Sequence, residues 1–258
     1  MNRIPLGVLA ALLTFIAAAP AGAAAPRPLR NTDVRKADGG PVAPAERQAR
    51  AALERSLGDE GVVATDRISG GARLVARTDG FLTGRDAAPA ASVALGYVRA
   101  HPEVFGVGAP DLAGLRLTRR YTSADGVTHL AWTQTYAGVA AYDNVLLANV
   151  EGDGRLVNIG GSAVSGLRVA SVVPDIGAGA ALAAARRQTG GALVAPRARQ
   201  GRGRERPTTF TGGDRARLAL FNDGATTRLA WVVEATGAHG WAYEVVVDAT
   251  TGATLKRS

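Results

Sequence analysis

The sequence predicts an α+β fold of two tandem units, each a helix packed on an antiparallel β-sheet. In both halves of the chain a helix-like segment comes before a series of strand-like runs. One phrase, Thr-x-Leu-Ala-Trp, also occurs twice, in residues 128–138 (THLAWTQTYAG) and 227–237 (TRLAWVVEATG). The Leu and Trp of each phrase are two residues apart, so on a strand they point to the same face. We expect the helix of each unit to cover that face.

In the first half, glycine and proline residues mark the ends of the expected helices and strands. Residues 45–57 have helical spacing and end at a glycine, and residues 62–78 alternate around Gly70-Gly71 as a hairpin does. A second helix over 90–100 should stop there, because Pro102 disfavours helical angles at the residue before it. The strand-like runs that follow are 115–122, 129–136, 141–150 and 155–160.

The second half repeats this order. Residues 178–188 form an alanine-rich helical pattern closed by glycine, and an arginine-crowded loop spans 195–207. In the turn 248–252, the Asp248 carboxylate can accept backbone N–H groups two residues on, and Gly252 can take a positive φ. The strand-like runs of this half are 217–221, 229–235, 242–247 and 253–257.

The first 25 residues have the three parts of an export signal. Arg3 supplies the positive start, residues 4–19 are apolar, and small residues offer cleavage sites at Ala23 or Ala25. The apolar run is short and interrupted by Pro and Gly, so we expect no stable membrane anchor. We therefore expect secretion to the extracellular space, with 26–58 as a flexible leader that carries one short helix.

Composition limits the chemistry. The 258 residues are 47% hydrophobic and carry a net charge of +8, which fits an acidic partner surface or ordinary solubility. The chain has no cysteine, so it forms no disulfide and has no thiol chemistry. The arginines of 195–207 lack interleaved aromatic residues, and we expect no nucleic-acid partner.

Motifs for catalysis are missing from the sequence. His101, His129 and His239 do not form an H-E-x-x-H pair, and there is no G-x-S-x-G, phosphate loop or dinucleotide fingerprint. Ser162 lies beside glycines, but a strand-end loop explains it better than a nucleophile. We expect no catalytic residue, no metal ligand and no cofactor in this chain.

Three stretches carry a resemblance to a known family. Residues 80–107 and 115–162 resemble the pro-region of secreted fungalysin- and thermolysin-type zinc metallopeptidases, whose signature Gln-x-Tyr-x-Gly stands here as Gln134, Tyr136 and Gly138. Residues 228–257 resemble the PepSY domain that follows in such precursors, with Trp231 in the Leu-Ala-Trp strand and an Asp-Ala-x-Thr-Gly turn from Asp248 to Gly252. The resemblance covers residues 60 to 258.

The resemblance implies a fungalysin/thermolysin propeptide (FTP)-like domain at 59–168 and a PepSY-like, cystatin-like domain at 169–258. Such pro-regions act as intramolecular chaperones and inhibitors, so the implied partner is a metallopeptidase catalytic domain, in cis or in trans. The residues implied as peptidase interface or fold motif are Gln134, Tyr136, Gly138 and Tyr142. Those implied as a maturation junction are Leu255, Lys256, Arg257 and Ser258.

Two departures from the family pattern leave alternatives open. Ala140 and Ala141 stand where the family often carries bulkier apolar residues, which would make a pocket there shallower. The sequence also contains no peptidase domain after Ser258. The chain could be a fragment, the product of a truncated gene, or a free-standing secreted inhibitor or binding module. A peptidase name inherited from the precursor family would be a further possibility, although the catalytic motif is missing.

Overall fold

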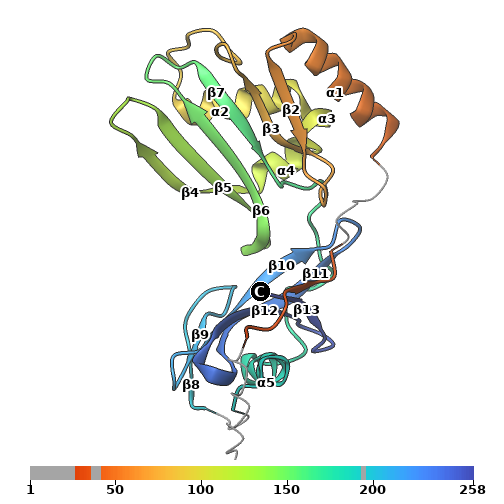
Figure 1. Cartoon of the computed structure of the whole chain (residues 1–258), viewed down its shortest axis with the longest axis vertical. Helices are drawn as coiled ribbons and strands as arrows, with labels where there is room; N and C mark the ends of the chain where they lie inside the picture. The colour runs from red at the N-terminus through yellow and green to blue at the C-terminus, as the bar shows by residue number, and fades with distance from the viewer. Residues whose placement is uncertain (1–26, 36–41, 193–195) are drawn as a thin grey trace, which may run out of the picture.

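The computed structural model describes residues 27–35, 42–192 and 196–258, and it has an α+β fold (Figure 1). The proposed signal-cleavage residues Ala23 and Ala25 lie outside these ranges. Within the described residues the strands form one connected set, in which β6 (Val139–Val150) pairs with β5, β7 and β10. We call the strands on the β5 and β7 side the first sheet, and those on the β10 side the second sheet.

The first sheet is antiparallel throughout, with the order β4-β5-β6-β7-β3-β2. Residues 128–136 pair with the edge strand β4 on one side and with β6 on the other, so the repeated phrase of the first half lies on an interior strand of this sheet. The bounds of its other strands are β2 Gly61–Thr65, β3 Ala72–Arg77, β4 Leu115–Thr122, β5 Thr128–Tyr136 and β7 Leu156–Gly161.

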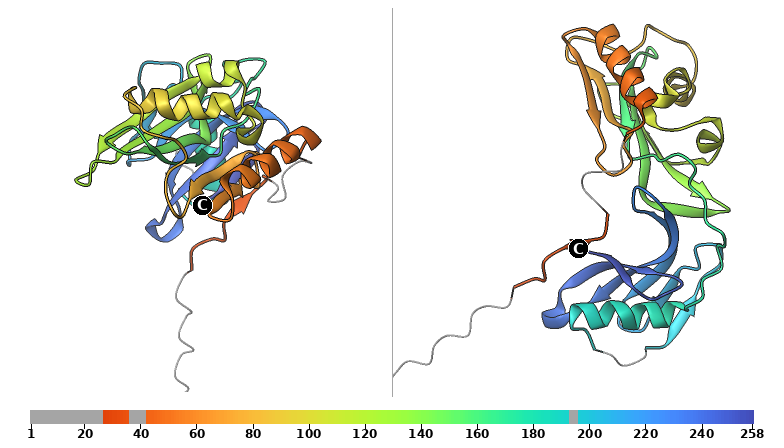
Figure 2. Two further views of the ribbon diagram at one scale, coloured as in Figure 1. Left: turned by 90° about the horizontal axis from the view of Figure 1, so that it is seen from above. Right: turned by 90° about the vertical axis from the view of Figure 1, so that its right-hand side faces the viewer.

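Helices cover one face of the first sheet (Figure 2). The core below them joins apolar residues of the helices to Leu130, Trp132 and Leu146 of the sheet. Trp132 is 3% exposed and shares this core with Val93, Ala94 and other residues of α2, as expected from its place in the repeated phrase. The helices are α1 Pro44–Leu57, α2 Ala90–Ala100, α3 Pro102–Phe105 and α4 Ala109–Ala113.

The second sheet has the order β1-β13-β12-β11-β10, with β9 and β8 continuing from one end of β10. Helix α5 (Ala178–Thr189) packs on one face, over Trp231, which is 2% exposed. The strands are β1 Thr32–Asp33, β8 Ala198–Gln200, β9 Thr208–Phe210, β10 Arg215–Asn222, β11 Thr227–Thr236, β12 Ala242–Asp248 and β13 Thr254–Arg257.

Strand β11 is buried on both faces. Leu229, Trp231 and Val233 face the core under α5, whereas Ala230 and Val232 face a smaller apolar cluster on the other side. That smaller cluster also contains Tyr142, Phe221 and Leu255.

Strand β6 runs from the second sheet into the first (Figure 1). Val139 and Ala140 pair with the end of β5, and Ala141 pairs in parallel with Leu220 of β10. From Val145 onward the strand pairs with β5 again and then also with β7. Val139 and Ala141, and also Val164 and Leu167 after β7, belong to the core under α5. The second core is therefore completed by residues that precede position 168.

Three features differ from the sequence expectation. The short helices α3 and α4 and the short strand β9 were not expected. The leader was expected to be flexible, but in its described part Thr32 and Asp33 form strand β1 on the edge of β13. The arginine-crowded segment was expected to be a loop, but Ala198–Gln200 pairs with β9. Two- and three-residue strands carry too little alternation for a sequence pattern to reveal them.

Candidate functional site: the β5–β6 hairpin and the junction of the two sheets

The Gln-x-Tyr-x-Gly motif forms the end of β5 and the turn into β6. Tyr136 pairs with Val139 across a two-residue loop of Ala137 and Gly138, whose φ angles are 49° and 79°. Two consecutive positive φ angles are typical of the type I′ turn that matches the twist of a β-hairpin. Gly138 therefore has a backbone role in the turn, while Ala137 occupies a left-handed conformation that is costly for a residue with a side chain.

Gln134 is directed into the interior. It is 2% exposed, and its Nε2 donates a hydrogen bond to the carbonyl oxygen of Val164 at 2.7 Å, while its Oε1 accepts from the N–H of Val164 at 2.8 Å. Its amide therefore holds the chain segment that leaves β7. In this geometry the amide is not available to a partner's backbone, which places Gln134 in the fold rather than on an open surface.

Tyr136 is half-buried and packs against the core under α5, although it belongs to a strand of the first sheet. Tyr136 and Gly138 thus lie where the hairpin tip reaches the second sheet. Glu205 meets the same tip, because its Oε1 accepts hydrogen bonds from the Ala140 N–H and from the Arg116 guanidinium, both at 3.3 Å. The contact of Glu205 with this hairpin was not anticipated from the sequence.

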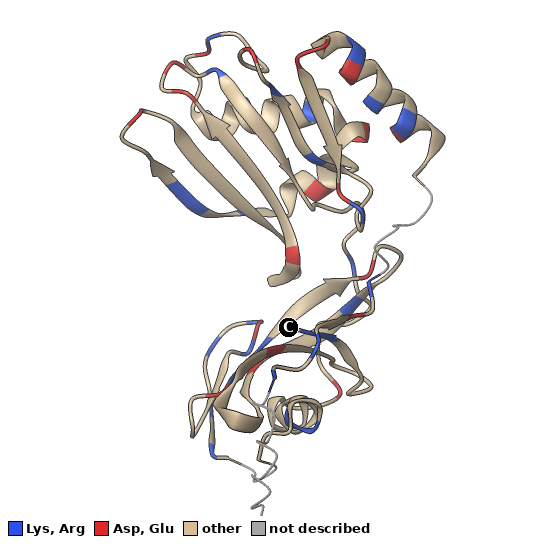
Figure 3. Ribbon diagram, in the orientation of Figure 1, with Lys and Arg blue, Asp and Glu red and all other residues tan. Residues whose placement is uncertain are grey.

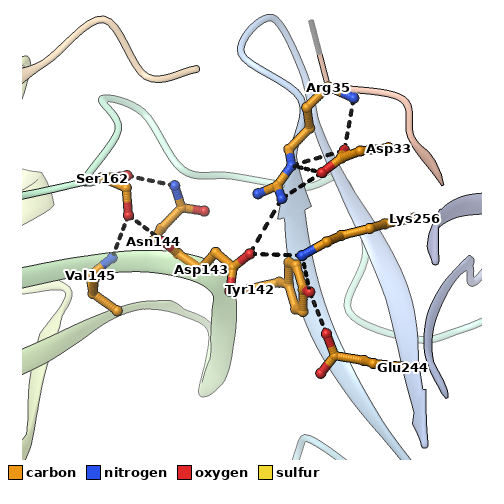
Figure 4. A network of polar contacts seen from close by, with 9 residues as sticks. All are labelled: Asp33, Arg35, Tyr142, Asp143, Asn144, Val145, Ser162, Glu244 and Lys256. Atoms are coloured by element: carbon orange, nitrogen blue, oxygen red, sulfur yellow. Dashed lines mark hydrogen bonds and ion pairs between the residues drawn. The ribbon is translucent and has the colours of Figure 1, made fainter. Parts of the chain in front are cut away.

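Tyr142 lies further along β6, in a polar network at the junction of the sheets (Figure 4). It is 5% exposed and its hydroxyl donates a hydrogen bond to the Glu244 carboxylate of β12. The Lys256 ammonium of β13 donates to the same hydroxyl oxygen at 2.6 Å. Burial and the hydrogen bond to Glu244 raise the pKa of Tyr142 far above its usual range, so the phenol remains protonated.

Asp143 gathers two cations from opposite ends of the chain. Its Oδ2 lies 3.4 Å from Lys256 Nζ and 3.3 Å from the guanidinium of Arg35, which belongs to the leader (Figure 4). Asp143 has a φ of 61°, and the strand changes its pairing partners at this point. An Asp tolerates this conformation better than most residues with side chains.

Arg35 is a central member of the network. Its side chain is 10% exposed, its Nη2 lies 2.7 Å from the Asp33 carboxylate, and its guanidinium carbon is 5.6 and 5.4 Å from the ring centroids of Tyr142 and Phe221. Burial acts to raise the pKa of Asp33, but the hydrogen bonds and charge of Arg35, together with Lys256, outweigh it and lower the pKa. Arg35 and Asp33 were not predicted from the sequence, since no local pattern distinguishes them from solvated leader residues.

Behind Asp143, the backbone of β6 is held by Asn144 and Ser162. Asn144 Nδ2 donates to the Ser162 carbonyl oxygen at 2.7 Å, and the Ser162 hydroxyl bonds to the Asp143 carbonyl oxygen and the Val145 N–H. Ser162 therefore supports the strand bend, in agreement with the strand-end role expected of it rather than with that of a nucleophile.

The residues singled out in the second half have structural surroundings. Trp231 Nε1 donates to the Ile176 carbonyl oxygen at 2.9 Å. The Asp248 carboxylate accepts the N–H groups of Thr250 and Thr251, both at 2.9 Å, and Gly252 has a φ of 76°, so the turn has the expected chemistry.

The expected maturation junction lies mostly within the second sheet. Leu255 is 4% exposed, Lys256 belongs to the network above, and Arg257 donates to the Arg30 carbonyl oxygen at 2.7 Å. Ser258 is exposed and exchanges two backbone hydrogen bonds with Glu244. Cleavage within this strand would require it to leave the sheet first, because proteases bind substrates in extended form with their backbone groups free.

The face of the first sheet opposite its helices is open to solvent. A row of outward side chains crosses the four strands β4 to β7. The rings of Tyr121 and His129 stack with their centroids 4.5 Å apart, and His129 Nδ1 lies 2.7 Å from Asn149 Oδ1. Asn149 Nδ2 in turn donates a hydrogen bond to Asn158 Oδ1. Leu147, on the same face, is 49% exposed. The edge strand β4 adds a basic stretch (Figure 3) of Arg116, Arg119 and Arg120.

Within the described ranges, no group of three or more His, Cys, Asp or Glu side chains is placed to hold a metal ion. Among the helices in those ranges, none is long and apolar enough to cross a membrane. The features of the site that could contact a partner are a hairpin tip, a strand edge and an open sheet face.

Comparison with known families locates one match on this geometry. Residues 113–163 match the Fungalysin/Thermolysin Propeptide Motif. The matched segment begins at the end of α4 and contains β4, β5, β6 and β7, with Gln134, Gly138 and Tyr142 among its residues. No curated protein matches the chain. The meander that carries the Gln-x-Tyr-x-Gly hairpin is therefore similar to the propeptide motif of fungalysin- and thermolysin-type peptidases.

Proposed function

We propose that this chain is the pro-region of a secreted zinc metallopeptidase of the fungalysin/thermolysin type, and that it binds, chaperones and inhibits the peptidase domain. One observation carries the proposal: the propeptide-motif match coincides with a complete meander, β4 to β7, in which the motif glutamine and glycine have defined fold roles. The chain itself is proposed to be non-catalytic.

The physical basis is complementarity between surfaces. A pro-region that binds the native peptidase and not its unfolded chain lowers the free energy of the folded state by mass action. When both parts belong to one polypeptide, their effective concentration is on the order of millimolar. Binding over the active-site cleft then inhibits the enzyme until the linking segment is cut.

We further propose that the chain comprises an FTP-like unit at 59–168 and a PepSY-like unit at 169–258, after a signal peptide that directs secretion. Two separate cores, one under α2 and one under α5, support the division. Strand β6 and residues 139, 141, 164 and 167 tie the units together, so we expect them to unfold cooperatively rather than independently.

The open face of the first sheet is the surface we propose for the peptidase. It belongs to the strands that match the propeptide motif, and it exposes Leu147 and Tyr121 beside Arg116 and Arg119 of β4. Exposed apolar groups beside a basic edge strand suit a partner face that is apolar at its centre and acidic along one edge.

The test is inhibition in trans. The purified chain should inhibit the peptidase domain from its own locus or from the nearest homologue. Leu147→Glu should weaken inhibition at least tenfold while the melting temperature is unchanged, because Leu147 is half-exposed. Val173→Glu is the matched control, since Val173 is 59% exposed in the segment between β7 and α5. Absence of inhibition by the wild-type chain would refute the proposed function, and equal inhibition by both variants would refute the proposed face.

The second candidate is a free-standing secreted inhibitor of the same fold. The same fold features support it, and the gene distinguishes the two: a reading frame with H-E-x-x-H joined after Ser258 identifies a precursor, and a stop codon identifies a free inhibitor.

A further inference from the structure

The outer edge of β13 is occupied by the chain's own leader. Thr32 and Asp33 pair with Arg257 and Lys256, and Val34 N–H donates to the Leu255 carbonyl oxygen at 2.9 Å. The contact extends along residues 29–34, with Leu29 N–H donating to the Tyr243 hydroxyl at 3.2 Å and Arg257 donating to the Arg30 carbonyl oxygen. The leader therefore lies on this edge as an added strand does.

One side chain of the leader enters a built receptor. Arg35 lies over the rings of Tyr142 and Phe221 and 3.3 Å from the Asp143 carboxylate, and only 10% of its side chain is exposed. Aromatic faces and a carboxylate are the groups that bind a guanidinium best. The Asp33 carboxylate holds the Arg35 guanidinium from the leader side, because it accepts hydrogen bonds from Nε and Nη2 of Arg35.

We propose that the edge of β13, together with Tyr142, Phe221 and Asp143, is an acceptor site for an extended basic peptide, and that residues 29–35 are its exchangeable intramolecular ligand. The recognised pattern is a strand with an acidic residue followed two positions later by arginine. The inference goes beyond the proposed function and does not depend on it.

Three features make the ligand exchangeable. Strand β1 is only two residues long, whereas β13 also pairs with β12 along its other edge, so removal of the leader leaves β13 in place. The leader's side-chain contacts are concentrated in Asp33 and Arg35, so one substitution weakens the hold strongly. A sheet edge without its added strand presents unpaired N–H and C=O groups that accept another strand.

The experiment uses the full chain and a synthetic peptide of residues 27–35. Arg35→Ala should speed hydrogen exchange in the segment 29–35 at least tenfold relative to wild type, with little change in the core strand β11. Arg30→Ala is the matched control: it removes the same charge from the same segment, but the Arg30 contact to Arg257 is made by its backbone carbonyl. Unchanged exchange in Arg35→Ala would overturn the assignment of Arg35 as the anchor.

Peptide binding tests the acceptor directly. The fluorescently labelled peptide should bind the Arg35→Ala chain at least tenfold more tightly than wild type, where the tethered leader competes at an effective concentration on the order of millimolar. A peptide that carries the same Arg35→Ala change should not bind, and Asp143→Asn in the Arg35→Ala chain should weaken binding of the native peptide. Equal binding to wild type and variant, or binding that survives Asp143→Asn, would overturn the site. Dimerisation of the variant through its leader would also overturn the intramolecular assignment.

Discussion

The side-chain amide of Gln134 is bonded at both ends to the backbone of Val164, thirty residues further along the chain. The pair acts as one rung of a β-ladder in which a side chain replaces a strand. Val164 is itself 6% exposed and belongs to the core under α5, whereas Gln134 belongs to a strand of the first sheet. The two bonds therefore hold the chain where it passes from one core to the other.

Replacement of Gln134 by leucine should destabilise the protein by about 2–4 kcal/mol, because it leaves the N–H and C=O of Val164 buried without partners. Thr133→Ala is the control, since Thr133 is the neighbouring β5 residue and its side chain is only partly buried. Urea unfolding measures the difference. If inhibition of the peptidase is lost while the unfolding midpoint is unchanged, Gln134 contacts the partner and the fold role is wrong.

Two substitutions at the hairpin tip should change the stability of the protein in opposite directions. Gly138→Val forces a branched side chain to a φ of 79°, with its Cβ 3.1 Å from Arg204 Cγ, and should cost about 2 kcal/mol or more. Ala137→Asn should stabilise by up to about 1 kcal/mol, since Asn-Gly is a favoured pair for this turn. Thermal melts of both variants measure the signs, and a stabilising Gly138→Val would contradict the turn assignment.

The two tryptophans of the repeated phrase should contribute comparably to stability. Trp132→Ala and Trp231→Ala each empty a large buried volume, in separate cores, and should each cost about 3–5 kcal/mol. Trp231→Phe keeps an aromatic ring in the core but loses the hydrogen bond to the Ile176 carbonyl oxygen, which by itself should cost ~1 kcal/mol. If either alanine variant melts at the wild-type temperature, the tryptophan at that position does not contribute to its core as expected.

Tyr97 of α2 carries a buried hydroxyl without a hydrogen-bond partner in the described structure. Tyr97→Phe should therefore stabilise the protein by about 1 kcal/mol at neutral pH. Burial raises the pKa of Tyr97 to about 12, so the unfolded chain loses this proton first as the pH rises. Wild-type stability should fall between pH 10 and about 12 more than that of Tyr97→Phe. Parallel stability curves for the two proteins over this range would refute the assignment.

The sequence by itself determined the elements whose signals are local. The helices predicted at 90–100 and 178–188, the strands of both meanders and the turn from Asp248 to Gly252 follow from periodicity, proline and glycine placement, and side-chain capping of nearby N–H groups. Burial of Trp132 and Trp231 followed as well, because alternation on a strand assigns its faces before any partner is known.

Tertiary structure alone decided what joins these elements. Gln134 has the same sequence surroundings whether its amide faces a partner or Val164, and only the path of the chain after β7 brings Val164 to it. Arg35 and Asp143 lie 108 positions apart, and the leader becomes a strand only because β13 offers it an edge. Contacts of this kind depend on which distant segments the fold brings together, and neither local propensity nor periodicity in the sequence predicts which segments those are.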